Sequence, residues 1–122
     1  MIEQLVGKVF YDRDAAHLQH WKVKGPGSYA QHAALGAFYD TVIGQVDSIV
    51  EAYQGYFDLI AMVPPTPGNR LPSDIIEHLS ETCDWIDENR EKIAKDNSAI
   101  ENLIDTLSET YMSTLYKLRN LR

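Results

Sequence analysis

An unbroken apolar stripe in the first half of the chain constrains the fold more than any other feature. Apolar residues follow one another at steps of three and four: Leu35, Phe38, Val42, Val46, Ile49, Tyr53, Phe57 and Ile60. Such steps place side chains on one face of an α-helix, which has 3.6 residues per turn. The stripe therefore predicts a long helix that begins after Ser28, as an N-cap, and ends between Gly55 and Ala61.

Three further amphipathic segments accompany this helix. The first is predicted from about Ile2 to Lys24, with apolar residues at helical spacing up to Phe10, and the breaker Gly25-Pro26-Gly27 ends it. Another is predicted near Ser73 to Lys95. The last opens at Ser98, which forms a capping-box pattern with Glu101. Strand-like alternation is absent from the sequence, so we expect an all-α, four-helix bundle in one domain over residues 1–122.

The connection between the second and third helices decides the topology of this bundle. The segment from Val63 to Pro72 holds four of the five prolines and is predicted to be a loop. If the second helix ends near Gly55, the connection has about eighteen residues and crosses the length of the bundle easily. If the helix continues to Ala61, an up-down-up-down bundle is easier to build, because ten residues span at most roughly 35 Å.

Composition narrows the function classes. The net charge is −7, from 18 Asp and Glu against 11 Lys and Arg. An acidic surface repels DNA and attracts metal cations, so DNA binding is not expected. A single cysteine, Cys83, excludes an intrachain disulfide. The apolar stretches are too short to span a bilayer, and the mixed pattern from Glu3 onward predicts no signal peptide, so we expect a cytoplasmic protein.

A second pattern consists of four polar residues. His20 and His32 lie symmetrically about Pro26, so a hairpin folded at that proline brings both imidazoles to one height on adjacent helices. Asp47 and Glu51 are four residues apart and share a face of the long helix. His32 and Asp47 are separated by about 22 Å along the helix axis, so one helix cannot bring them to the same ion.

A two-fold axis would resolve this separation. If the long helix met its copy antiparallel, with the crossing near Asp40, the two histidines of one chain would face the two carboxylates of the other. Gly36 and Gly44 flank that crossing, and small residues let helix backbones approach closely. Mixed imidazole and carboxylate ligands suit Fe(II), Mn(II) or Zn(II), so the pattern predicts a metal site between subunits.

The segment from Leu18 to Ala52 resembles the Dps family, the mini-ferritins named for DNA protection during starvation. The resemblance rests on His20-Trp21 before the turn at Gly25-Pro26, on His32 twelve residues later, and on Asp47-x-x-x-Glu51. Outside this segment, which is about a third of the chain, the similarity is limited to the helical pattern.

The resemblance implies a ferritin-like four-helix bundle whose homodimers build a larger cage, a dodecamer in the family. It implies a ferroxidase that oxidises Fe(II), often with peroxide, and stores the ferric mineral. It also implies ligand roles: His20 and His32 from one subunit, Asp47 and Glu51 from its partner. Trp21 would be the aromatic residue that passes an electron beside the site.

Three features depart from the family pattern. Gly36 stands where the family often has an aspartate, the segment before the third helix lacks a small extra helix, and no basic N-terminal tail is present to bind DNA. These departures keep a second interpretation open. In it, the protein is a non-catalytic ferritin-like scaffold or binding module with a structural or vestigial metal site.

Simpler interpretations apply to other titratable residues. His17 lies one turn before His20 and is interpreted as a surface residue rather than an auxiliary ligand. His78, between Glu77 and Glu81, is predicted to face solvent. Cys83 falls on the apolar stripe of the third helix and is interpreted as an inert core thiol.

Overall fold

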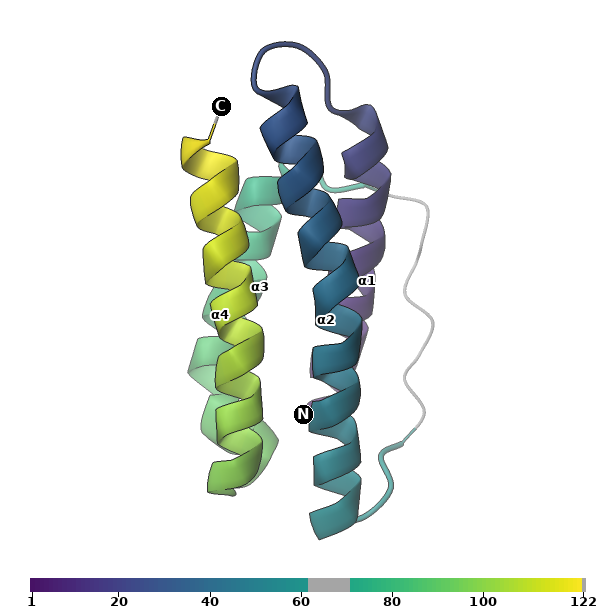
Figure 1. Cartoon of the computed structure of the whole chain (residues 1–122). Helices are drawn as coiled ribbons and strands as arrows, with labels where there is room; N and C mark the ends of the chain where they lie inside the picture. The colour runs from purple at the N-terminus through teal and green to yellow at the C-terminus, as the bar shows by residue number, and fades with distance from the viewer. Residues whose placement is uncertain (62–70, 122) are drawn as a thin grey trace.

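The computed structural model describes residues 1–61 and 71–121. Within these residues all regular secondary structure is helical, as predicted (Figure 1). The elements are α1 (Ile2–Lys22), α2 (Ser28–Tyr56), α3 (Ile75–Ala94) and α4 (Ser98–Asn120). Most of the predicted loop Val63 to Pro72 lies outside the described residues; its last two residues, Leu71 and Pro72, are not helical. None of the described helices is long and apolar enough to cross a membrane.

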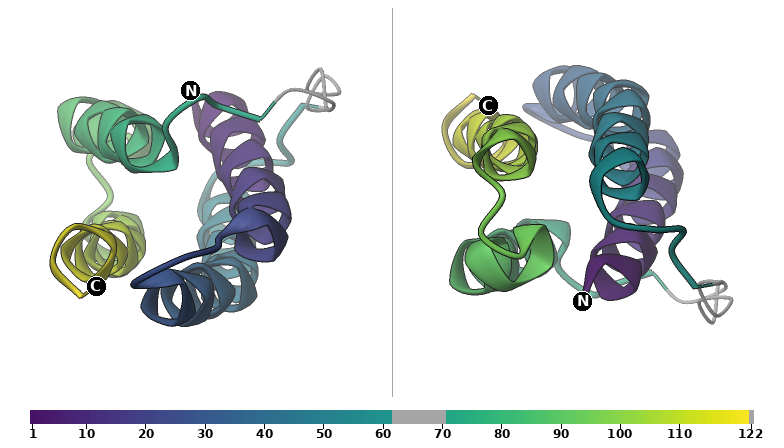
Figure 2. Two further views of the ribbon diagram at one scale, coloured as in Figure 1. Left: turned by 90° about the horizontal axis from the view of Figure 1, so that it is seen from above. Right: turned by 90° about the horizontal axis from the view of Figure 1, so that it is seen from below.

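The helices form a bundle with the spatial order α1-α2-α4-α3. α1 packs against α2 and α3, while α4 packs against α2 and α3; the view along the bundle shows this order (Figure 2). α2 ends at one end of the bundle and α3 begins at the other, so these two helices run in the same direction (Figure 1). The chain therefore crosses the length of the bundle between α2 and α3, which excludes the up-down-up-down alternative.

Apolar side chains from all four helices form a single core. The predicted stripe of α2 supplies Leu35, Phe38, Val42, Val46 and Ile49, each at most 1% exposed. Its last members, Tyr53, Phe57 and Ile60, pack against the core but are only partly buried, and the last two lie beyond the end of α2 at Tyr56. Phe10 of the predicted α1 stripe is 41% exposed and lies outside the core.

The helix ends differ from the predictions by one or two residues. α1 ends at Lys22 rather than Lys24, and the N-cap of α2 is Gly27 rather than Ser28. The turn between them uses two glycines in the left-handed region, Gly25 (φ 86°) and Gly27 (φ 81°), where a side chain would be strained. α3 begins later than predicted, after Asp74, whose side chain accepts hydrogen bonds from the backbone of the first turn.

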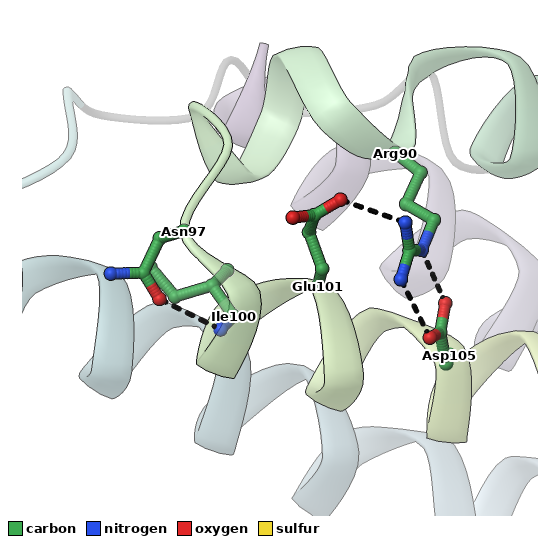
Figure 3. A network of polar contacts seen from close by, with 5 residues as sticks. All are labelled: Arg90, Asn97, Ile100, Glu101 and Asp105. Carbon is green, nitrogen blue, oxygen red and sulfur yellow. Dashed lines mark hydrogen bonds and ion pairs between the residues drawn. The ribbon is translucent and has the colours of Figure 1, made fainter.

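The predicted capping box of α4 is wrong. Asn97, not Ser98, is the N-cap, and its side chain accepts a 3.1 Å hydrogen bond from the Ile100 amide. The Glu101 carboxylate reaches across to Arg90 of α3 (2.7 Å), and the same guanidinium binds both carboxylate oxygens of Asp105 (Figure 3). An ion pair between helices has thus replaced the local bond to the backbone, and it joins α3 to α4.

Candidate functional site

The α1–α2 hairpin brings two of the four predicted metal ligands together. The imidazoles of His20 and His32 stack with ring centroids 3.5 Å apart and planes inclined by 19°. Their backbone bonds are reciprocal: His20 Nδ1 lies 2.7 Å from the carbonyl oxygen of His32, and His32 Nδ1 lies 2.8 Å from that of His20. Each ring is therefore held by the opposite helix.

These two bonds determine which nitrogen of each ring carries the proton. A carbonyl oxygen only accepts hydrogen bonds, so each Nδ1 must be protonated and donate. In the neutral imidazole the lone pair then lies on Nε2, the nitrogen left available to a metal. No described residue hydrogen-bonds either Nε2. This is how metal-binding histidines are commonly oriented, with the remote N–H bound to a backbone carbonyl.

Gly36 gives the His20 ring its space. A Cβ added at Gly36 would lie 3.3 Å from Cε1 and 3.5 Å from Nδ1 of His20, tighter than an ordinary van der Waals contact for the first atom. A larger side chain at this position would push the ring away from its carbonyl partner. The departure from the Dps pattern at Gly36 is thus coupled to the position of His20.

The two predicted carboxylate ligands lie elsewhere on the chain. Asp47 and Glu51 are exposed on α2, about 22 Å and 28 Å beyond His32 along the helix axis. Within the described part of one chain, no group of three or more His, Cys, Asp or Glu residues is close enough to hold a metal ion. A single copy therefore offers two imidazoles, and a complete ligand set requires atoms from outside it.

An aromatic cluster surrounds the histidine pair. The His17 ring stacks on Tyr39 (centroids 4.0 Å apart, 12° between planes), and Tyr39 meets His20 edge-on at 5.3 Å. Trp21 is 67% exposed, with its ring 4.8 Å from that of His17. His17 is half-buried in this cluster rather than a simple surface residue. Trp21 connects to the pair through His17 and remains accessible to solutes.

Comparison with known proteins places the chain in a family. Residues 20–118 match DUF5856, a family of unknown function. The chain belongs to DUF5856. No curated protein and no solved structure matches it. The segment matched by DUF5856 begins at His20 and includes all four predicted metal ligands, whereas most of α1 precedes it.

A buried polar cluster in this DUF5856 protein was missed by sequence reasoning. Asp12 of α1 is 0% exposed; its Oδ2 accepts a 2.6 Å hydrogen bond from the Tyr111 hydroxyl of α4. Its Oδ1 lies 2.6 Å from His78 Nε2 of α3. The prediction that His78 faces solvent is therefore wrong, because the ring reaches inward to a buried carboxylate. Asp12 continues the α1 apolar stripe, because Leu5, Val9 and Asp12 follow one another at steps of four and three residues. A carboxylate at a core position of the helix was the available signal.

The cluster changes the protonation behaviour of its members. The hydrogen bond to Asp12 raises the pKa of His78 above its usual value, which favours the imidazolium form. Complete burial, together with the negative charge of Asp12, raises the pKa of Tyr111 well above its usual value. Burial also raises the pKa of the half-buried Cys83 thiol, consistent with an unreactive side chain. The cluster thus places the buried Asp12 side chain between the Tyr111 phenol and the His78 imidazole.

Proposed function

We propose that this DUF5856 protein is a Dps-like mini-ferritin that binds and oxidises Fe(II) at a site shared between two subunits. The observation that carries the proposal is the His20–His32 pair. Two stacked imidazoles have their Nδ1 protons fixed by backbone carbonyls, and both Nε2 lone pairs remain available. Imidazole nitrogen is a good ligand for Fe(II), and also for Zn(II) or Mn(II).

The carboxylates complete the proposed site. In an antiparallel pair of α2 helices, Asp47 and Glu51 of one copy lie beside the histidines of the other. Carboxylate oxygens favour the harder Fe(III) product, so such a ligand set stabilises the oxidised state. Iron here is the substrate. Trp21, exposed beside His17, is the residue we propose to pass an electron between the site and an external oxidant.

Two features of the fold support a ferritin-like relationship. α2 and α3 run in the same direction, and the chain crosses the bundle between them, which is the arrangement of ferritin-like bundles with one long connection. The exposed face of α2 also carries Gly44, where an added Cβ would meet nothing within 4 Å, so a second α2 could approach closely there. We further propose that such dimers assemble into a cage, and that the protein works in the cytoplasm, since its single cysteine needs no oxidising compartment.

A specific observation favours a second candidate, a non-catalytic ferritin-like scaffold. The reciprocal bonds of His20 and His32 clasp α1 to α2 without any metal. Such a pair of bonds stabilises the α1–α2 hairpin even where no metal is bound. In this alternative the exposed carboxylates of α2 form interface charge pairs, and the purified oligomer neither holds metal nor takes up iron.

Iron oxidation by defined variants distinguishes the two candidates. Fe(II) is added anaerobically, peroxide follows, and ferric absorbance is recorded. We expect His32→Ala and Glu51→Ala each to abolish rapid oxidation, and Glu88→Ala, an exposed carboxylate of α3, to leave it unchanged. Wild-type rates in both site variants would reject the assigned site and favour the scaffold.

Mixing the two inactive variants tests whether the site is shared between subunits. A mixed dimer of His32→Ala and Glu51→Ala copies has one site with both defects and one site with none. Random exchange makes about half of the dimers mixed, so about a quarter of all sites should regain activity. A site built within one chain would regain none.

A further inference from the structure

Two copies of α2 that pack against each other would repel through their negative charges. Over its 29 residues it contains no Lys or Arg, and its exposed surface carries Asp40, Asp47 and Glu51. Two antiparallel copies would gather six carboxylates along one interface. Like charges across an interface oppose association, so positive charge has to come from another helix or from bound metal. At the two ends the histidines and metal can supply it; the centre, near Asp40, needs a separate cation.

A pocket at the middle of the α1–α2 face contains a suitable cation, the Arg13 guanidinium. It has a volume of about 210 Å³ and is lined by Arg13, His17, Tyr39, Asp40 and Ile43. The Arg13 side chain is 38% exposed, and its ion pair is a 3.5 Å contact with Asp14, the next residue in the chain. No described residue forms an ion pair with Asp40. Both charges are thus available to a second molecule.

The register of the proposed dimer brings these charges together. Within one chain, the pocket shows that Arg13 lies level with residues 39–43 of α2. Between copies, the proposed site sets His32 opposite the turn from Asp47 to Glu51. The same antiparallel register sets Asp40 of the second copy opposite residues 39–43 of the first. Arg13 of one copy and Asp40 of the other therefore lie at the same height in the interface. The two-fold axis produces this contact twice.

We propose that the α1–α2 pocket receives the Asp40 carboxylate of a second copy, and that Arg13 binds it. The inference rests on the proposed function, because it uses the same antiparallel dimer. The two exchanged ion pairs neutralise the centre of the acidic interface. The planar guanidinium can bind a carboxylate through two parallel hydrogen bonds, which also fixes the register that brings the histidines to the partner's acidic pair.

Reversing each charge and then mixing the variants tests the exchange. Arg13→Glu places like charges at both contacts of a homodimer, and so does Asp40→Lys. We expect each variant to dimerise on the order of 100-fold more weakly than wild type, as measured by sedimentation equilibrium. In a mixture of the two, both contacts pair opposite charges, so a heterodimer of near wild-type affinity should form. Asp14→Lys, a charge reversal next to Arg13, keeps both Arg13 and Asp40, so it should dimerise with itself like wild type but should not form a heterodimer of near wild-type affinity with Arg13→Glu.

Each outcome bears on a distinct claim. A mixture that stays monomeric, or an Arg13→Glu variant that dimerises like wild type, overturns the ion-pair exchange. If the His32→Ala and Glu51→Ala mixture still regains activity in that case, the shared iron site stands without it. A wild-type protein that is monomeric at all concentrations overturns both proposals. Circular dichroism verifies folding of each variant, and Arg13→Ala with Asp40→Asn provide milder substitutions should either reversal unfold the chain.

Discussion

The Tyr111 hydroxyl is the most informative group to remove from this protein. Tyr111→Phe keeps the ring, which is 0% exposed and meets Phe38 edge-on at 4.9 Å, so little volume is lost. What disappears is the 2.6 Å hydrogen bond to Asp12 Oδ2. The Asp12 side chain is 1% exposed, so water cannot easily replace the lost donor.

The expected loss of stability follows from this geometry. A hydrogen bond to a charged group contributes about 1.5–3 kcal/mol, and the buried position of Asp12 argues for the upper half of that range. We therefore expect Tyr111→Phe to lower the free energy of unfolding by about 2–3 kcal/mol. For a domain of this size each kcal/mol shifts Tm by roughly 4 °C, so Tm should fall by about 10 °C.

Urea unfolding followed by circular dichroism measures the change. Tyr116→Phe is the matched control: the same substitution on the same helix, but at a side chain that is 58% exposed, where a change within about 0.5 kcal/mol is expected. Combining Tyr111→Phe with Asp12→Asn should give a loss smaller than the sum, because the two groups share one interaction. A loss below about 0.5 kcal/mol for Tyr111→Phe, or strict additivity with Asp12→Asn, would refute the reasoning.

Three further predictions concern other parts of the molecule. The raised pKa of His78 means that its bond to Asp12 stabilises the fold fully below the usual histidine pKa, 6.5, and less as pH rises through the folded value; His78→Gln should therefore destabilise more at pH 6 than at pH 9. Gly36→Ala should raise helix stability by up to about 1 kcal/mol yet weaken Fe(II) binding by about tenfold, because its Cβ crowds His20. Asp74→Ala should lower the free energy of unfolding by about 1 kcal/mol through loss of the α3 N-cap.

Matched measurements make these predictions decisive. A pH profile for His78→Gln parallel to that of wild type would contradict the assigned ion pair. Gly55→Ala is the control for Gly36→Ala, since an added Cβ at Gly55 meets nothing within 4 Å; equal Fe(II) affinities in both variants would contradict the coupling between Gly36 and the position of His20. For the α3 cap, Asp74→Asn should retain most of the stability that Asp74→Ala loses, since asparagine also caps well.

The helices were predictable from sequence because their signals are local. The apolar stripe of α2 and the Gly25-Pro26-Gly27 breaker act within a few residues, so the elements and the hairpin follow from spacing alone. The end of α2, in contrast, was predicted only to within Gly55 to Ala61. Phe57 leaves the helix where the Lys95 ammonium lies 4.8 Å from its ring centroid. That lysine sits in the α3–α4 turn with φ 50°, a position that local pattern does not reveal.

In the candidate site, too, contacts between residues close in sequence were predictable, and contacts between distant residues were not. His20 and His32 share a hairpin, so their twelve-residue interval sufficed to predict that the rings would meet. The pairing of these rings with Asp47 and Glu51 is a statement about two molecules, and it stays a prediction. Asp12, in contrast, meets partners 66 and 99 residues away, and only the order of helices in the bundle brings them together.

Asp12 and the histidine pair act on the same helix. Bonds from Asp12 to α3 and α4 limit rotation of α1 about its axis. His20 follows Asp12 by eight residues, about 12 Å along that axis and roughly 80° around it, so the rotation of α1 about its axis sets the direction of both side chains together. The same rotation of α1 directs Arg13, the residue after Asp12, into the α1–α2 pocket. The buried cluster therefore has a role beyond stability: it orients the face of α1 that carries the proposed ligand and the proposed interface cation. α1 packs less extensively against α3 than against α2, so the hydrogen bond from His78 to Asp12 adds a directional contact where apolar packing is weaker.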